Sequence, residues 1–494
     1  MTLPFLSTRA IQYDYDLQDR LTQIHNYKKL SGADTLSTYS YAYDYNQDTG
    51  QATIKGYRTK MDEYINTTPP ANRTEKYGYD NLYQLIKSDY SGDLTDIFQW
   101  SYDSIGNRIQ QITSNPSSTT NYTYYQLEPG YNSQLLRHDG SKCYVWDLNG
   151  NLLCTKYKAT IDECPAIGNP HQESFCQFSP TADGDAVYSW DEDNRLIGLE
   201  WYENSNTHTA QYFYDFNGNR YKKIVGSTST TYLYHNEDIV KSGSKYYVHS
   251  PGIDEPAFIC PNDSCANPYY YFADGLGSIR QIIDDASSSN IENLYRYGSW
   301  GELTSPFSKT ENVDNFYIYT SRESAENNLY YYRARYYDSK SSRFASMDQL
   351  IRNRFFNKFL KSISGYSYVH NSSIQRTDPS GLSDGAFPGT FPYPWYPPKD
   401  SCVPNAGTIG LAVAAATAIT IIIVCAIWDC WDKPMNCTYK GEIKGTEDNP
   451  SAVICEYQCD DGTWGVFLMD WMTYDLYGCP KSKDKSQLVP IPYV

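Results

Sequence analysis

The chain has 494 residues, which is enough for two or more domains, and its formal net charge is −17. This acidic balance argues against a nucleic-acid-binding protein, which would carry a basic patch, so no nucleic acid is expected as a partner. Tyr occurs 50 times, and this abundance favours a mainly β-structure.

An aromatic–Asp motif recurs through the first half of the chain. The copies are Tyr15-Asp16, Tyr43-Asp44, Tyr79-Asp80, Tyr102-Asp103, Trp146-Asp147, Trp190-Asp191 and Tyr214-Asp215. Their starting positions are spaced by 23 to 44 residues. Self-similarity at such spacings predicts a repeat architecture, in which each unit buries its apolar face against its neighbours.

The last of these copies shows what one repeat is expected to form. The aromatic strand 211–214 enters a turn at Asn217-Gly218-Asn219, whose residues suit positive φ angles, and residues 220–224 leave as the next strand. The motif's Asp is expected to accept a backbone N–H in the turn or to pair with the following Arg. Both roles are structural and not catalytic, so we predict β-hairpin repeats over residues 1–268.

The thirteen cysteines are grouped along the chain. They occur as Cys143/Cys154, Cys164/Cys176 and Cys260/Cys265, and then in a group from Cys402 to Cys479. None of these spacings matches a zinc site, because the close pair at 455 and 459 lacks a second close pair. Disulfides formed in an oxidising compartment are the favoured interpretation, and reduced buried cysteines are the alternative.

The first nine residues do not resemble a signal peptide, because they lack a basic start and an adequate apolar run. We expect an array that has lost its upstream part, or a fragment of a longer secreted protein. The expected location is therefore outside the cell or at its surface.

From Tyr269 onward the repeat motif gives way to other sequence motifs. Three segments stand out, namely Asp274–Arg280 (DGLGSIR), Leu329–Asp338 (LYYYRARYYD) and Asp378–Leu382 (DPSGL). Together with the repeats, they resemble the Rhs/YD-repeat family over about residues 10–382, with an Rhs-repeat-associated core domain at 269–382.

The resemblance implies a fold and a function. The fold would be a spirally wound shell of β-hairpins that the core domain closes as a plug, as in the teneurins. In this family such shells encapsulate a C-terminal polypeptide, often a toxin, so the chain's own C-terminal segment is the implied partner. The teneurins use the same fold in adhesion.

The resemblance also implies a catalytic site. In this family the end of the core domain acts as an aspartyl autoprotease that cuts just after the D-P-x-G-L motif. The matching carboxylates are Asp348 and Asp378, the cut would fall between Leu382 and Ser383, and Arg343 would orient or charge-balance the pair. Such chemistry needs one carboxylate to activate water and another to protonate the leaving amine. The alternative is that residues 378–381 form only a turn that closes the domain.

The sequence contains no other recognisable catalytic arrangement. The seven His residues are scattered, with no i, i+4 pair that would bind a metal on a helix, and no phosphate-binding loop is present. We therefore predict no cofactor, no metal site and at most an autocatalytic activity.

A Pro-rich linker at 383–405 and a hydrophobic segment at 406–433 follow the core. Residues 409–428 run without a charge, and 20 residues in a helix match the thickness of a hydrocarbon core. A membrane span is therefore predicted there. The alternative is a hydrophobic helix that stays inside the shell until release.

Residues 434–494 are expected to form a small variable Cys-rich module. Its residues Cys455–Trp464 suggest a hairpin, and Cys437, Cys455, Cys459 and Cys479 are candidates for disulfides. Four cysteines allow three pairings, between which the sequence does not choose. No nuclease, deaminase or transferase signature is recognised in this module.

Three hypotheses about function follow. The first is an Rhs-type structural and delivery protein, whose shell carries a variable C-terminal tip that acts as a toxin or effector. The second is a membrane-anchored surface protein that binds cell-surface carbohydrate or protein in adhesion, without catalysis. A third is a decayed fragment with no current function.

Overall fold

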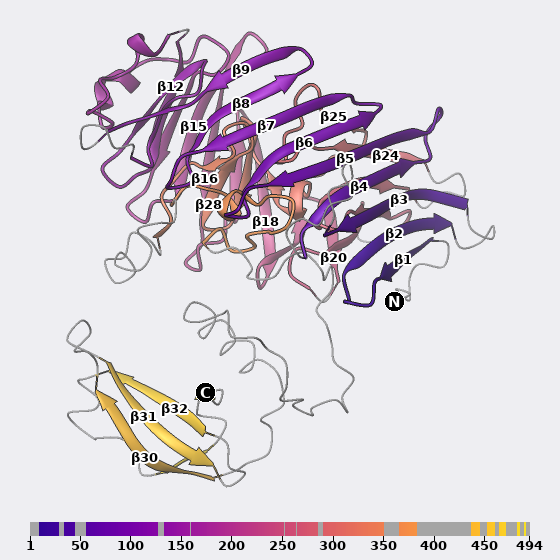
Figure 1. Ribbon diagram of the computed structural model, residues 1–494, viewed down its shortest axis with the longest axis vertical. Coiled ribbons are helices and arrows are strands. Elements are labelled where there is room, and N and C mark those ends of the chain that lie inside the picture. Colours follow the sequence, from indigo (N-terminus) through magenta and orange to yellow (C-terminus); the bar gives the residue numbers. More distant parts are fainter. Residues whose placement is uncertain are drawn as a thin grey trace. The chain divides into compact units, whose positions relative to one another are not determined.

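The structure is a computed structural model, shown in Figure 1. It describes residues 9–28, 34–44, 56–126, 133–158, 160–250, 252–262, 264–284, 290–349 and 365–382, and the strands at 436–444, 452–459, 464–470, 482–484 and 489–490. The chain divides into two compact units, Met1–Trp395 and Tyr396–Val494.

The first nine strands form one antiparallel sheet in which each strand pairs with the next one in the chain (Figure 1). They are β1 (Arg9–Tyr15), β2 (Leu21–Lys28), β3 (Asp34–Tyr43), β4 (Arg58–Ile65), β5 (Ala71–Tyr79), β6 (Leu85–Gly92), β7 (Asp96–Tyr102), β8 (Arg108–Ser114) and β9 (Ser117–Asn121). Buried residues alternate with less buried ones along much of β3 and β4. One face of this sheet is therefore the inner face, since successive side chains of a strand point to opposite sides.

The next sixteen strands form a second sheet, again in chain order. They are β10 (Thr123–Tyr124), β11 (Leu136–His138), β12 (Lys142–Trp146), β13 (Leu152–Tyr157), β14 (Ala186–Trp190), β15 (Leu196–Glu203), β16 (Asn206–Phe213), β17 (Lys222–Val225), β18 (Thr228–His235), β19 (Asp238–Ser242), β20 (Lys245–His249), β21 (Pro256–Cys260), β22 (Tyr269–Ala273), β23 (Ile279–Ile283), β24 (Ile291–Arg296) and β25 (Ser308–Glu311). The sheet runs without interruption through position 269, where the core domain was expected to begin.

A small third sheet completes the first unit. Its strands are β26 (Glu323–Ser324), β27 (Leu329–Tyr332), β28 (Arg335–Asp338) and β29 (Arg343–Phe344), flanked by the 3₁₀ helices η3 (Tyr319–Ser321) and η4 (Val369–Asn371). We call residues 319–349 and 365–382 the closing segment. Its tyrosines pack against two parts of the second sheet, where Tyr331 and Tyr336 join the apolar cluster of β10–β16 and Tyr332 and Tyr337 join that of β18–β24.

The turns of the repeats confirm the structural role predicted for the motif's Asp. In six copies, and again at Asp274, one carboxylate oxygen accepts the N–H groups of the second and fourth following residues at 2.7–3.1 Å; these are Asp16, Asp80, Asp103, Asp147, Asp191, Asp215 and Asp274. The other oxygen binds a following Arg at Asp16, Asp191 and Asp274. Asp44 differs, since it binds Arg20 and the Gly56 N–H.

Positive φ angles in these turns occur at the third residue after the Asp. Within Asn217-Gly218-Asn219, only Gly218 has one, at 86°, whereas all three residues were expected to supply it. Gly106, Gly150 and Gly277 occupy the same position, each with a φ of 80°. The left-handed conformation is therefore needed at one residue, where glycine meets no steric penalty.

An aromatic residue at or near the end of a strand ties several repeats to the preceding one, and four of these residues belong to the motif: Tyr43, Tyr102, Trp190 and Tyr214. Tyr102 Oη donates to the Leu85 carbonyl at 2.6 Å, and Leu85 is the fifth residue after Asp80. The same bond recurs from Tyr43 to Leu21, Tyr124 to Arg108, Trp190 to Leu152, Tyr214 to Leu196, Tyr234 to Arg220 and Tyr297 to Ile279. Repeats are thus linked side by side through an aromatic donor and a strand-start carbonyl.

The closing segment binds the same turns from inside. The carbonyl of Gly106 accepts from Asn371 Nδ2 at 2.8 Å, and that of Gly150 accepts from Tyr366 Oη at 2.9 Å. The carbonyls of Gly218 and Gly277 accept from Tyr331 Oη and Ser321 Oγ. The turns at the edge of the repeats therefore form the surface to which the closing segment binds.

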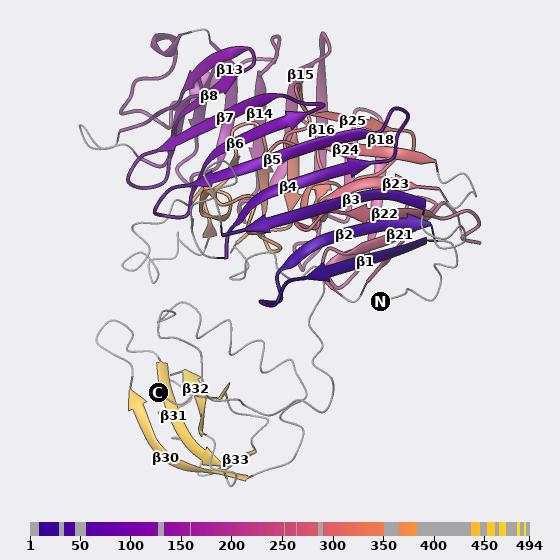
Figure 2. The ribbon, with the colours of Figure 1, turned by 45° about the vertical axis from the view of Figure 1, so that its right-hand side comes forward.

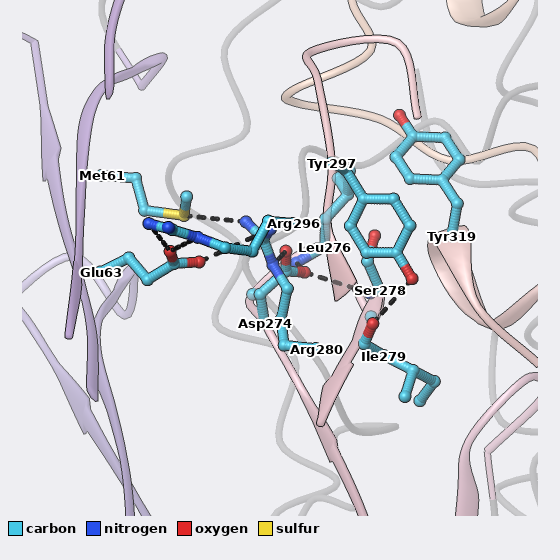
Figure 3. Close-up of polar contacts among 12 residues, drawn as sticks. Met61, Glu63, Asp274, Leu276, Ser278, Ile279, Arg280, Arg296, Tyr297 and Tyr319 are labelled. Carbon is cyan, nitrogen blue, oxygen red and sulfur yellow. Dashed lines mark hydrogen bonds and ion pairs between the residues drawn. The ribbon is translucent and has the colours of Figure 1, made fainter. Parts of the chain in front are cut away.

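A buried ionic network joins the first sheet to the second. Glu63 on β4 lies 2.8 Å from Arg296 and 3.6 Å from Arg280, while Arg280 also binds Asp274 at 2.7 Å (Figure 3). Figure 2 shows β1–β5 lying across β21–β25, in agreement with these contacts. The two meanders thus pack face to face as opposite walls of one body, in keeping with the predicted β-shell.

Three disulfides form, as predicted, within the described part of the chain. Two of them connect the β12–β13 hairpin to the insertion that follows it, pairing Cys143 with Cys164 and Cys154 with Cys176. The third closes a short loop between Cys260 and Cys265.

The second unit contains a five-stranded sheet in the order β33-β30-β31-β32-β34. Its strands are β30 (Asn436–Lys444), β31 (Ala452–Cys459), β32 (Trp464–Asp470), β33 (Ser482–Asp484) and β34 (Val489–Pro490). Strands β31 and β32 pair antiparallel, with Gln458 opposite Trp464. Cys479 and the side chains of Cys437, Cys455 and Cys459 lie outside the described part, so the disulfides expected there stay predictions.

Within the described ranges, no helix combines the length and the apolar character that crossing a bilayer requires. The segment 409–428, for which a span was predicted, lies outside those ranges, as do the linker and Ser383.

Candidate functional site

Asp348 and Asp378, which lie 30 positions apart in the sequence, contact one guanidinium group. Arg335 Nη2 on β28 is 3.1 Å from Asp348 Oδ2 and 3.4 Å from Asp378 Oδ2. All three side chains are less than a tenth exposed. The structure therefore brings the two predicted carboxylates together.

Arg343 does not take the position that the resemblance implied for it. In the described part of the chain it forms no ion pair with either aspartate; its guanidinium contacts the Gln134 carbonyl at 2.5 Å and lies over the rings of Tyr124 and Tyr366. The charge-balancing position belongs to Arg335 instead. Sequence reasoning missed this residue, although it belongs to the LYYYRARYYD segment that was singled out.

The turn between β12 and β13, at the edge of the second sheet, positions the backbone of Asp348. After β29 the chain runs along the turn between β12 and β13, where the Met347 N–H donates to the Gly150 carbonyl at 3.1 Å. The Asp348 N–H donates to the Gly365 carbonyl at 3.0 Å. This edge pairing fixes the backbone that carries the carboxylate.

Asp378 is positioned by its own turn. Its Oδ1 accepts the Gly381 N–H at 2.8 Å and the Ser380 hydroxyl at 3.3 Å. The turn that was the structural alternative is thus present, and Asp378 still contacts Arg335 through its second oxygen. The structural role and the proposed catalytic role are compatible.

The segment that ends at Leu382 is held by its backbone. The Pro379 carbonyl accepts from Arg322 at 3.0 Å and from Arg333, and the Gly381 carbonyl accepts from Arg335 Nε. The Ala334 N–H donates to the Ser380 carbonyl at 3.2 Å. These contacts bind main-chain atoms, so they fix the path of the chain up to the predicted cut.

Gly381 is required by this close approach. Its φ is 73°, and a Cβ atom there would lie 2.0 Å from the Tyr332 carbonyl oxygen. Only glycine allows the segment to lie this close to the turn between β27 and β28.

The arginines of the site are affected by their burial. Desolvation lowers the pKa of Arg335, although the charges of Asp348 and Asp378 act in the opposite direction. Burial and the neighbouring charge of Arg333 lower the pKa of Arg322 to about 10. Arg322 therefore keeps its charge at neutral pH and remains an effective partner for the Pro379 carbonyl.

A cavity of about 200 Å³ opens beside Asp378. It is lined by Tyr13 of β1, by strand β22 and its following turn, and by Arg322 and residues 377–379. Asp378 belongs to this lining, and the volume is large enough for several water molecules.

No protein-family model matches the chain. The chain is 26% identical over 315 residues to the tRNA3(Ser)-specific nuclease WapA of Bacillus spizizenii and to the tRNA nuclease WapA of Bacillus subtilis. Each match covers 61% of this chain and 12% of the relative. The chain thus spans about an eighth of the length of these relatives, and the similarity supports the resemblance to the Rhs/YD-repeat family at a coarse level.

Among solved structures, the crystal structure of TcdB2-TccC3-TEV is similar, with a TM-score of 0.45 and 17% identity over 76% of this chain and 18% of that one. The Photorhabdus luminescens Tc holotoxin pore has a TM-score of 0.38 and 14% identity over 77% of this chain and 21% of that one.

Proposed function

We propose that the chain acts as an Rhs-type delivery protein, whose β-repeat wall carries a C-terminal polypeptide and releases it by cutting after Leu382. The observation that carries this proposal is the contact of Arg335 with both Asp348 and Asp378, next to a backbone segment held up to the predicted cut. The similarity to the WapA nucleases supports the delivery class.

The proposed step is the hydrolysis of one peptide bond. One carboxylate takes a proton from a water molecule, whose oxygen attacks the Leu382 carbonyl carbon. The other carboxyl group gives its proton to the Ser383 nitrogen as the C–N bond breaks. Arg335 Nη2 contacts both Oδ2 atoms, at 3.1 and 3.4 Å. Two carboxylates near each other favour a proton on one of them, since like charges repel.

The experiment compares the purified chain with Asp348→Asn and Asp378→Asn on a denaturing gel, with N-terminal sequencing of every fragment. A fragment that begins at Ser383 is expected in the wild type and in neither variant. Asp103→Asn, which alters a turn aspartate, is the control and is expected to cut like the wild type.

An intact wild-type chain recovered from the membrane fraction would contradict the proposal and favour the membrane-anchored surface protein. A cut in both site variants would assign the cleavage to a contaminating protease.

A further inference from the structure

The β12–β13 hairpin is the support on which the backbone of Asp348 rests. The Leu152 N–H donates to the Ala345 carbonyl at 2.8 Å, and Asn151 and Ser346 form an isolated antiparallel bridge. The Met347 N–H also donates to the Gly150 carbonyl. Three consecutive hairpin residues, 150–152, therefore pair with the segment that leads to Asp348. A shift of this hairpin would therefore move the carboxylate.

Two disulfides in turn connect the hairpin to the insertion between β13 and β14. Cys143 on β12 pairs with Cys164, and Cys154 on β13 pairs with Cys176. The insertion also binds both backbone groups of the last β12 residue, because the Trp146 N–H donates to the Pro170 carbonyl at 3.0 Å and His171 Nδ1 lies 3.0 Å from the Trp146 carbonyl oxygen.

The insertion has little core of its own to keep it in place. Its two 3₁₀ helices, η1 (Ile161–Glu163) and η2 (Glu173–Cys176), contain no buried residue. Small segments that cannot bury an apolar core depend on disulfides for their order. The two cross-links, at sequence separations of 21 and 22 residues, therefore reinforce the hydrogen bonds that hold the insertion against Trp146.

We infer that the disulfides Cys143–Cys164 and Cys154–Cys176 are positioning elements for Asp348, so that self-cleavage after Leu382 depends on their oxidation. This inference rests on the proposed function. In a reducing compartment only hydrogen bonds hold the insertion on the hairpin, the edge that carries Asp348 loosens and the chain stays intact. After transfer to an oxidising compartment the site is completed and the C-terminal polypeptide is released.

The redox step is ordinary thiol–disulfide exchange. Each disulfide forms when a pair of thiols transfers two electrons and two protons to glutathione disulfide, which leaves as two molecules of glutathione. Reduction by dithiothreitol reverses the step and leaves dithiothreitol as its cyclic disulfide. No metal or other oxidant is required.

The test uses the full chain, purified in dithiothreitol and then exchanged into glutathione disulfide. The Ser383 fragment is expected to appear on oxidation, and the cleavage rate to rise about 10- to 100-fold. The double variants Cys143→Ser/Cys164→Ser and Cys154→Ser/Cys176→Ser are expected to lose most of this rise. Cys260→Ser/Cys265→Ser, which removes the third disulfide, is the matched control and is expected to keep it.

Backbone amide exchange separates positioning from a general loss of stability. Exchange at Met347 and Leu152 is expected to quicken in the two hairpin variants and to stay unchanged in the Cys260/Cys265 variant, all measured well below their melting temperatures. Cleavage at the wild-type rate in both hairpin variants would overturn the inference and leave the proposed function standing. No cleavage of the oxidised wild type would instead reject the proposed function.

Discussion

Arg335 and Asp348 form a buried ion pair, in which guanidinium Nη2 lies 3.1 Å from carboxylate Oδ2. The same nitrogen reaches Asp378, so removing the cation would leave two buried carboxylates without this partner. We expect Arg335→Gln to lower the free energy of unfolding by about 3–5 kcal/mol in urea denaturation, and to stop the cut after Leu382.

Arg343→Gln is the matched comparison, because it removes a second buried guanidinium from the same sheet. It is expected to lower stability as well, through the lost bond to Gln134, but to leave the cut in place. The opposite result, with cleavage lost at Arg343 and kept at Arg335, would restore the role that the family resemblance implies for Arg343.

Gly381→Ala is expected to displace the segment before the cut, since the new Cβ would overlap the Tyr332 carbonyl oxygen at 2.0 Å. Cleavage should fall below detection on a gel and the melting temperature should drop. Gly218→Ala is the control: its φ of 86° is also positive, but no atom lies within 4 Å of the added Cβ. In that variant the free energy of unfolding should fall by only about 1–2 kcal/mol, and the cut after Leu382 should still occur.

Asp215→Ala tests the role of the turn aspartate. It removes the acceptor of two hydrogen bonds, each 2.9 Å long, from the N–H groups of Asn217 and Asn219. The free energy of unfolding, measured by thermal or urea denaturation, is expected to fall by about 1–2 kcal/mol. Phe216→Ser in the same turn changes a side chain that is 96% exposed, and should change stability by about 0.5 kcal/mol or less. Equal effects of the two substitutions would contradict the predicted role of the Asp.

Stability should depend on pH through Glu302, which accepts the Trp300 N–H at 2.9 Å. Burial raises the pKa of Glu302 to about 7, from an ordinary value of 4.5, although Arg108 acts in the opposite direction. Between these values the folded chain holds a proton that the unfolded chain has lost. The free energy of unfolding therefore falls as the pH rises from about 4.5 to 7, by about 1–3 kcal/mol, and then levels off.

Glu302→Gln should flatten this dependence in denaturation curves measured from pH 5 to 8. Burial also raises the pKa of Glu255 to about 7, which gives a contribution of the same sign, so the variant keeps part of the slope. An unchanged slope in Glu302→Gln would exclude Glu302 as a source.

The repeats could be predicted from sequence because their chemistry is local. An Asp that accepts N–H groups two and four residues later, and a glycine with positive φ between them, form a turn whatever the rest of the chain does. The aromatic residue before the Asp indicated a strand for the same reason. The carbonyl that its hydroxyl or indole binds, such as Leu85 for Tyr102, belongs to another repeat and was not predicted.

The sequence by itself determined the array of hairpins and the presence of disulfides, since each depends on residue type and spacing, and its resemblance to the Rhs/YD-repeat family indicated the two aspartates as a candidate pair. The tertiary structure decided which arginine lies between Asp348 and Asp378, and which cysteine pairs with which. The physical reason is that Arg335–Asp378 depends on how the closing segment folds back on itself, and Cys143–Cys164 on how the insertion folds onto the β12–β13 hairpin, which no local spacing encodes.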